Sequence, residues 1–253
     1  MAMLSVSSGC FITHDYEHVK SMLDSTKADG FELIVYSSII DNIPSLIDEF
    51  SDLNRPIFSI HAPKVAQTLL SDPLFGQAAL RLLKQTASTA SALGASIMVV
   101  HAWDGRYRKL SMGSIKRSLE LLVGHCNDIG VKVSIEALPS RYKRPSELVG
   151  ELLSSSDDLS FTIDFEYAAA YGMFGELMEF SDRLSNVHLR DYNGMWLVDG
   201  KRAYLKPGSG DLDFKKLISM IRNRGYDSLY TIEAPYRCVE ELNDAIYFFK
   251  GLI

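Results

Sequence analysis

The sequence of 253 residues predicts an α/β fold, specifically a single (β/α)8 TIM barrel. Short apolar runs alternate along the whole chain with segments of helical periodicity. The alternation occurs eight times, with about 30 residues per repeat, which is the size of one βα unit. Several of the apolar runs are continuous, as is typical of parallel strands that are covered on both faces.

Eight segments carry the strand pattern. Each is rich in Val, Ile, Leu or Phe, which are favoured in strands, and each precedes a turn or a helical segment. The expected strands are Leu4–Ser8, Phe31–Tyr36, Ile57–His61, Ser96–His101, Val131–Glu136, Ser160–Asp164, Asn186–Leu189 and Leu229–Glu233.

The segments between these strands have helical periodicity. In one of the longest, Ile115, Leu119 and Leu122 recur on one helical face, and Gly130 follows the last periodic residue. A glycine at such a place ends many helices in the left-handed conformation, and the same role is expected of Gly30, Gly94 and Gly225. The expected helices are Asp15–Ala28, Pro44–Leu53, Leu74–Leu93, Ser111–Ile129, Pro145–Leu153, Tyr167–Phe180, Phe214–Asn223 and Val239–Phe249.

The composition indicates a globular protein. No linker or low-complexity tract interrupts residues 1–253, so one domain is expected. A net charge of −6 disfavours a broad nucleic-acid surface. No apolar run approaches the roughly 18 residues of a membrane helix, and the first residues lack the pattern of a signal peptide. A cytoplasmic location is therefore expected. Without a C-x-x-C pair, Cys10, Cys126 and Cys238 are interpreted as small buried residues.

Six consecutive expected strands, the third to the eighth, end on a residue that can bind a metal ion or transfer a proton. In a barrel the carboxyl ends of all strands meet at one rim, where active sites are built. Residues that are far apart in the sequence should therefore meet there. They are His61, His101, Glu136, Asp164, His188 with the following Arg190 and Asp191, and Glu233.

Four of these residues form a candidate metal site. Any one of them alone would more often be structural, but Glu136, Asp164, His188 and Glu233 would together place about three negative charges in one pocket. A divalent cation relieves this repulsion. Three carboxylates and one imidazole suit Mn²⁺, Mg²⁺ or Co²⁺, and they are compatible with Zn²⁺.

At these residues the chain resembles the xylose isomerase-like barrel superfamily. That group comprises sugar and sugar phosphate isomerases and epimerases, inosose dehydratases, hydroxypyruvate isomerase and endonuclease IV. Further resemblance lies in His188-Leu189-Arg190-Asp191, in Pro207-Gly208-Ser209-Gly210 and in Leu212-Asp213-Phe214. Together these motifs cover nearly the whole chain and are specific to the superfamily, though not to one substrate.

The resemblance implies a function in carbohydrate metabolism. One divalent metal ion, manganese being a typical choice, would be held by Glu136, Asp164, His188 and Glu233. Glu136 and Glu233 would also be the catalytic acid/base pair. Metal polarisation of a ketose acidifies the neighbouring C–H, and a glutamate can then move the proton through an enediolate. The expected enzyme is an isomerase or epimerase of a keto-sugar, a sugar phosphate or a related hydroxy-keto compound, or else a related dehydratase.

The expected substrate contacts are His61, His101, Trp103, Arg190 and Lys206. Arg190 is equally compatible with a salt bridge within the rim. The cationic members favour an anionic substrate such as a phosphate. No nucleic acid or membrane partner is expected, and a homo-oligomer remains open.

Three positions depart from the tagatose-type epimerases of this superfamily. Tyr142, Tyr167 and Gly194 stand where those enzymes carry a glutamate, a histidine and an arginine. This disfavours a strict free-ketose epimerase. The segments expected to set specificity are Gly9–Asp15, Pro63–Phe75, Trp103–Met112, Pro139–Pro145 and Tyr192–Pro207.

Two other functions remain as alternatives. The first is an endonuclease IV-like zinc phosphodiesterase acting on abasic DNA, because six strand-end positions match its ligands. The remaining ligands are not matched: Tyr167 replaces a histidine, and the loop after His188 contains Asp191 and Asp199 but no further histidine. The second is a non-catalytic binding module on a degenerate barrel.

Overall fold

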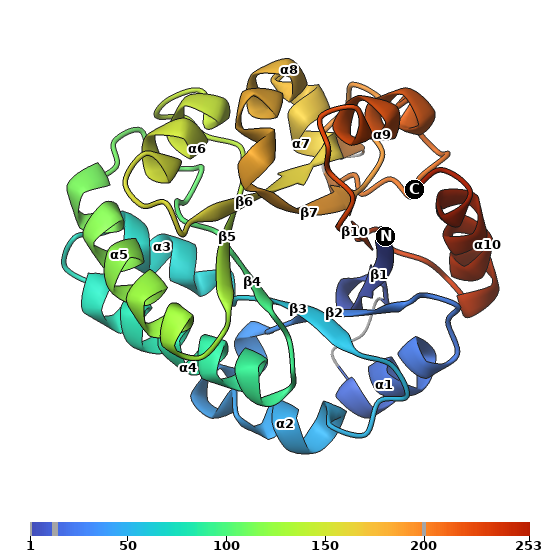
Figure 1. Ribbon diagram of the computed structural model, residues 1–253, viewed down its shortest axis with the longest axis horizontal. Coiled ribbons are helices and arrows are strands. Elements are labelled where there is room, and N and C mark those ends of the chain that lie inside the picture. Colours follow the sequence, from blue (N-terminus) through green and yellow to red (C-terminus); the bar gives the residue numbers. More distant parts are fainter. Residues whose placement is uncertain (1, 12–14, 199–200) are drawn as a thin grey trace.

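Eight parallel strands close into a barrel surrounded by helices (Figure 1). The computed structural model describes residues 2–11, 15–198 and 201–253. Around the barrel the strand order is β1, β10, β7, β6, β5, β4, β3, β2. The barrel strands are β1 Met3–Ser7, β2 Gly30–Ile34, β3 Ile57–His61, β4 Ile97–Val100, β5 Lys132–Glu136, β6 Ser160–Asp164, β7 Leu184–Leu189 and β10 Leu229–Ile232. The predicted (β/α)8 TIM barrel is confirmed, and every expected strand is present with small differences at its ends.

The helices follow the predicted alternation with two differences. The α-helices are α1 Tyr16–Asp24, α2 Ser45–Phe50, α3 Val65–Ser71, α4 Gly76–Ala92, α5 Met112–Asp128, α6 Pro145–Leu153, α7 Phe165–Ala170, α8 Phe174–Leu177, α9 Phe214–Arg222 and α10 Val239–Lys250, with 3-10 helices η1 Ser8–Cys10, η2 Ser37–Asn42 and η3 Met178–Arg183. Helix α3 was not predicted. The expected helix Tyr167–Phe180 is broken into α7, α8 and η3, because Gly172 has a φ of 56°.

The glycine prediction is confirmed at three of four positions. Gly94, Gly130 and Gly225 have φ values of 77°, 72° and 89°. Gly30 was predicted wrongly as a helix stop, since it is the first residue of β2. A Cβ there would lie 2.4 Å from the Phe58 ring and 2.5 Å from the Pro56 carbonyl oxygen. Close packing, rather than a left-handed backbone, therefore requires this glycine.

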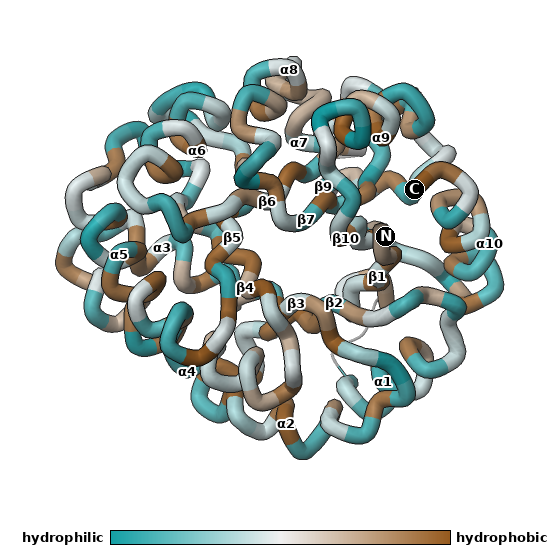
Figure 2. Tube along the Cα trace, viewed as in Figure 1, coloured by the Kyte–Doolittle hydropathy of each residue, from teal (hydrophilic) through white to brown (hydrophobic). Residues whose placement is uncertain are grey.

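Hydrophobic residues concentrate on the strands and on the helix faces turned towards them, while hydrophilic residues occupy the outer helix faces and the loops (Figure 2). The barrel interior is nevertheless partly polar. Ser134 and Thr162 lie 2.6 Å apart through their hydroxyls, and Ser185 donates to Ser134 at 2.7 Å. Within the described residues, no helix has both the length and the apolar character needed to cross a membrane.

A small two-stranded sheet lies in the connection between β7 and α9. It pairs β8 Leu197–Val198 with β9 Lys201–Arg202 and was not predicted. Asp191 fixes the base of this connection: its backbone N–H donates to Leu205, and its carboxylate accepts from the backbone N–H groups of Gly208, Gly210 and Leu212 at 2.8, 2.9 and 3.1 Å.

Candidate metal centre and active site

The four predicted metal ligands meet at the carboxyl end of the barrel. Glu136 and Asp164 are the last residues of β5 and β6, His188 is the last but one of β7, and Glu233 directly follows β10. Each residue offers one ligand atom, and these atoms all lie within 4.8 Å of one another. The first three side chains are buried, and Glu233 is only 13% exposed. The strand-end prediction therefore identified a real spatial cluster.

The contact between His188 and Glu233 indicates how this cluster fits a cation. His188 Nδ1 lies 2.9 Å from Glu233 Oε2 and 3.3 Å from Glu136 Oε1. Yet neither Nδ1 nor Glu233 Oε2 has a hydrogen-bond partner, although both are buried. Leaving such atoms unsatisfied is costly. Three carboxylates and an imidazole that turn their ligand atoms towards one another could hold one divalent metal ion, so the residues present fit this group.

Glu136 also belongs to a second group of potential ligands. Its Oε2 lies 3.3 Å from His61 Nε2 and 2.5 Å from His101 Nε2, and the three residues form a further set whose ligand atoms lie within 4.8 Å. His61 Nδ1 faces the Ala62 carbonyl at 2.9 Å, so in the neutral ring the proton is on Nδ1. A lone pair on Nε2 then faces a carboxylate, an arrangement that needs a shared proton or a cation.

Electrostatics in the cluster follow from burial and from these contacts. Burial alone would raise the pKa of Glu136, but the neighbouring His101 and His188 hold it well below its usual range. The pKa of Glu233 is likewise lowered against the effect of burial, chiefly by Arg190 and His188. Burial raises the pKa of Asp164 to about 7, although Arg190 opposes the shift. Glu136 and Glu233 are therefore the carboxylates that favour the charged form.

Arg190 forms the salt bridge that was one of its two predicted roles. Its Nε donates to Asp164 Oδ2 at 2.7 Å, and its guanidinium is only 5% exposed. It also lies 3.6 Å from Glu166 and stacks 4.8 Å above the Tyr167 ring. Glu166 in turn pairs with Arg202 of β9 at 2.5 Å. These ion pairs tie the β8–β9 connection to the metal-ligand cluster.

A pocket of about 620 Å³ opens above the cluster, with Glu233 and Arg190 in its lining. Its walls come from the chain after β1, β2, β3 and β10 and from the connection before α9. Lys64 lies on this lining and is exposed, and among the described residues it forms no ion pair. The lining residues are Gly9, Phe11, Ile34, Val35, Tyr36, Ser37, Ser38, Lys64, Arg190, Tyr204, Glu233, Ala234 and Pro235.

Of the five residues expected to contact substrate, only Arg190 lines this pocket, and His61, His101, Trp103 and Lys206 do not. Trp103 is fully buried, and its indole N–H donates to the Pro139 carbonyl at 3.2 Å. Lys206 pairs with Glu241 at 3.0 Å and lines a separate hollow beside α10. Trp103 is therefore held in the core, and Lys206 is held by an acidic side chain away from the pocket. The Nε2 atoms of His61 and His101 both face Glu136 Oε2.

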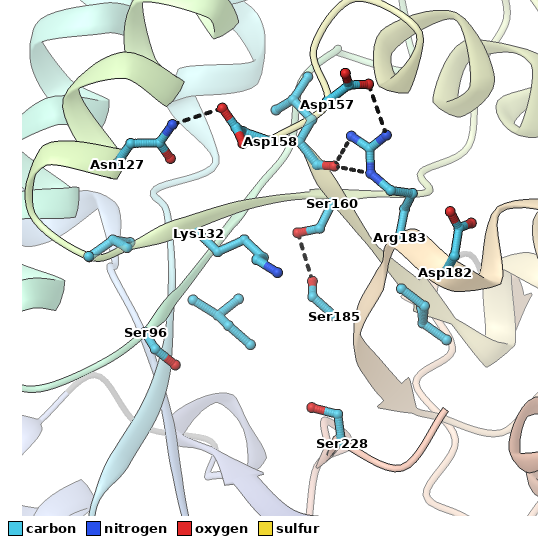
Figure 3. Close-up of a pocket in the computed structure, with 15 residues that line it drawn as sticks. Ser96, Asn127, Lys132, Asp157, Asp158, Ser160, Asp182, Arg183, Ser185 and Ser228 are labelled. Atoms are coloured by element: carbon cyan, nitrogen blue, oxygen red, sulfur yellow. Dashed lines mark hydrogen bonds and ion pairs between the residues drawn. The ribbon is translucent and has the colours of Figure 1, made fainter. Parts of the chain in front are cut away.

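A larger hollow, of about 820 Å³, lies at the opposite end of the barrel strands (Figure 3). Several of its polar side chains bond to one another: Asn127 donates to Asp158 at 2.9 Å and Ser160 donates to Ser185 at 3.0 Å. Lys132, the first residue of β5, lines it, whereas Glu136 ends the same strand. Residues at this end of such barrels serve stability rather than chemistry.

Sequence reasoning missed three residues around the cluster. Glu32 lies inside the barrel on β2, Glu166 pairs with two arginines, and Lys64 faces the pocket. A signal existed for Glu32, because it interrupts the apolar run from Phe31 to Val35 in the same way that Glu233 ends its own. Lys64 had none, since an exposed loop lysine is ordinary. Asp199 lies outside the described residues.

Comparisons with known proteins agree with this architecture. A family model described as xylose isomerase-like TIM barrel matches residues 22–248. Two uncharacterized proteins of Methanocaldococcus jannaschii are 20% and 24% identical over 205 and 201 residues. The matches cover 78% of this chain and 77% of the first protein, and 73% of this chain and 61% of the second.

Solved structures with the same fold include two sugar epimerases and one epimerase-like protein. D-allulose 3-epimerase from Methylomonas sp., in complex with D-allulose, has a TM-score of 0.79 at 15% identity, covering 100% of this chain and 97% of its own. The structure of 3-keto-D-glucoside 4-epimerase from E. coli has a TM-score of 0.74 at 17% identity, and the match covers 99% of this chain and 100% of its own. A D-tagatose 3-epimerase-like protein has a TM-score of 0.73 at 18% identity, and the match covers 98% of this chain and 97% of its own. With the family model matching most of its length, the chain belongs to the xylose isomerase-like TIM barrel family.

Proposed function

We propose that the protein is a divalent-metal-dependent isomerase or epimerase of a small keto-sugar, a sugar phosphate or a related hydroxy-keto compound. One observation carries this proposal: the possible ligand atoms of four residues lie within 4.8 Å of one another, and two of these atoms, His188 Nδ1 and Glu233 Oε2, have no hydrogen-bond partner. The four residues are Glu136, Asp164, His188 and Glu233. These four residues would hold the metal ion. When bound, it would polarise the carbonyl and hydroxyl oxygens of the substrate and so acidify the adjacent C–H.

The two glutamates would carry out the proton transfer. Both have lowered pKa values and are therefore ionised at neutral pH, as a base must be. Glu233 lines the pocket and is the more accessible, so it would take the proton from the substrate carbon. Return of a proton to the opposite face of that carbon gives epimerisation, and return to the neighbouring carbon gives isomerisation. Glu136 would be the second proton carrier, since both glutamates contact His188 Nδ1.

The kind of substrate is supported by the relatives with this fold. Their names include epimerases of D-allulose, of L-ribulose and of a 3-keto-D-glucoside, and each of these substrates has a carbonyl next to a hydroxyl-bearing carbon. Lys64 adds a feature of this chain. An ammonium group that forms no ion pair with the residues that the structure describes, on the lining of the same pocket, suits a phosphate or carboxylate on the substrate.

A second candidate, zinc-dependent phosphodiester cleavage, is favoured by one observation. His61, His101 and Glu136 could hold a second cation beside the first. Against it, Asp191 is engaged by three backbone N–H groups and Tyr167 offers no ligand for a third. We therefore retain the isomerase or epimerase as the proposed function.

Elemental analysis of protein purified without added metal or chelator tests the proposal. About one Mn, Mg, Co or Zn per chain, lost in a Glu136→Ala/His188→Ala variant, is expected. A screen of keto-sugars and their phosphates, followed by exchange of substrate carbon-bound hydrogen with D2O, would then identify the substrate. Two or more zinc ions per chain would favour the second candidate. No metal after soaking with Mn²⁺ would overturn the proposal and favour a non-catalytic binding module.

A further inference from the structure

Glu32 is a buried carboxylate that the proposed proton transfer does not use. It lies in the middle of β2, is 0% exposed and does not line the substrate pocket. Its Oε2 accepts from the Ser59 hydroxyl at 2.7 Å and from the Asn186 amide at 3.1 Å. Burying a carboxylate is costly unless donors compensate it, so its position inside the barrel requires a physical reason.

The orientation of Asn186 is determined by its other contacts. Its Oδ1 accepts from the Thr231 hydroxyl at 2.9 Å and from the Val187 backbone N–H at 2.8 Å. With two donors on the oxygen, the amide nitrogen must face Glu32. The side of Glu32 that faces β7 is therefore lined by donors only.

The third neighbour of Glu32 is the ring of His188. His188 Nε2 lies 3.4 Å from each of the two Glu32 oxygens, while Nδ1 faces Glu136 and Glu233. A carboxylate only accepts hydrogen bonds, so this contact favours a proton on Nε2. The Nδ1 lone pair is then directed into the metal-ligand cluster. Carboxylates that bind the far nitrogen of a metal-bound histidine commonly set its tautomer and strengthen it as a ligand.

We propose that Glu32 is a positioning residue for His188, which it holds in the Nε2–H form so that Nδ1 can bind a divalent cation. This inference rests on the metal site of the proposed function. Asn186 makes the role specific, because its amide nitrogen lies 3.2 Å from His188 Nε2. Without the Glu32 charge, this amide can donate to Nε2 and hold the ring with its proton on Nδ1, where it would block a metal ion.

The test is the affinity for Mn²⁺, measured by electron paramagnetic resonance of the free ion in wild type and variants. Glu32→Gln keeps the shape and removes the charge, and it should bind Mn²⁺ about 10- to 100-fold more weakly with little change in melting temperature. Ser59→Ala is the matched control, since it also loses a hydrogen bond to Glu32 but does not touch His188. It should retain the wild-type affinity.

A charge-swapped variant separates positioning from general damage. Glu32→Gln/Asn186→Asp returns a carboxylate to the neighbourhood of His188 Nε2 and should recover much of the lost affinity. In addition, ¹⁵N spectra of the Zn²⁺-loaded wild type should show the His188 proton on Nε2. Equal Mn²⁺ affinity in wild type and Glu32→Gln, or an equal loss in Ser59→Ala, would each overturn the inference while leaving the metal site standing. A proton on Nδ1 would overturn the inference and also remove His188 Nδ1 from the proposed ligands. A wild type that binds no metal would overturn both.

Discussion

Glu233 Oε2 and His188 Nδ1 lie 2.9 Å apart, both buried, in a contact that is an ion pair only when the imidazole is protonated. Two buried polar atoms at this distance lower their free energy most by sharing a third group, and a divalent cation is the group that this cluster of donors suits. The pair joins a residue that reaches the substrate pocket to one that is fully buried. Substitutions at Glu233 should therefore affect chemistry more than folding.

Glu233→Gln should reduce turnover by about 100-fold or more, because an amide cannot accept the substrate proton at neutral pH. The melting temperature of the metal-free protein should change little, since the residue is partly exposed. Exchange of the substrate's carbon-bound hydrogen in D2O measures the step directly. Glu240→Gln, an exposed position on α10, is the control. Unchanged exchange would remove Glu233 from the mechanism.

Lys64→Gln should raise KM for phosphorylated keto-sugars by roughly 10-fold or more, because a charge-assisted hydrogen bond is lost. The KM for the corresponding neutral sugars should stay within about twofold. Lys64→Arg keeps the positive charge and should retain most of the preference. Steady-state kinetics on paired phosphorylated and free sugars test this. Equal effects on both members of a pair would contradict an anion-binding role.

Arg190→Met should destabilise the metal-free protein by about 3–5 kcal/mol, because it leaves buried Asp164 without its charged partner. Urea unfolding measures the change. Mn²⁺ should restore part of the stability, since a cation that binds only the folded state raises its stability. Arg144→Met, which removes one partner of an ion pair whose side chains are 38% and 45% exposed, serves as a comparison for a surface ion pair. A free energy of unfolding within 1 kcal/mol of wild type would show that Arg190 does not neutralise the cluster.

Asp104 provides a test of acid stability away from the metal site. It is 1% exposed and accepts from the Arg106 backbone N–H at 3.0 Å and from the Thr68 hydroxyl at 2.8 Å. The Arg106 side chain, which donates to the same carboxylate, is the main cause that lowers the pKa of Asp104 from 3.8 to about 2. A depressed carboxyl pKa stabilises the fold above the ordinary value and loses this contribution as the pH falls towards the folded value.

Asp104→Asn should therefore cost about 1–3 kcal/mol at pH 7, and its difference from wild type should shrink as the pH falls from 3.8 towards about 2. Urea unfolding at a series of pH values measures both. The exposed Asp157→Asn should have little effect at any pH. A difference that is constant with pH would mean that the charge of Asp104 contributes nothing.

The three cysteines should differ in reactivity. Burial raises the pKa of Cys10 and Cys126 to about 12, which leaves almost no thiolate at neutral pH. Cys238 is partly exposed. One thiol should react with an aromatic disulfide reagent in the native protein, and three in denaturant. Cys238→Ser should abolish the native reaction, and a rapid native reaction of that variant would show that a buried thiol opens readily.

The cluster at the strand ends was predictable because a charged residue that closes an apolar run is unusual and the barrel brings such ends together. Arg190 follows His188 by two residues, so the same pattern also predicted its position at the rim, where it binds Asp164. Local signals also set the helix ends at Gly94 and Gly130. Features that depend on packing between distant segments were not predictable. Phe58 and Pro56 leave no room for a side chain at Gly30, and the indole of buried Trp103 donates to the Pro139 carbonyl.

Glu32 shows a different limit. Its charge was visible in the sequence, but its partners Ser59, Asn186 and His188 come from β3 and β7. Only closure of the barrel places them around it. The β8–β9 pair was missed because its strands are too short to carry a period. Element types were therefore predictable, whereas side-chain partners were not.

The anchoring of the connection before α9 has a consequence for how substrate preference can change. Asp191 binds Leu205 through its backbone and Gly208, Gly210 and Leu212 through its carboxylate, and a Cβ at Gly210 would lie 2.5 Å from its Oδ1. Both ends of the segment 192–205 are thus held together at one point, so a change in its length adds little closure entropy. Evolution or an engineer can exchange this segment as a unit, with its wall of the pocket, and leave the cluster of Glu136, Asp164, His188 and Glu233 where it is.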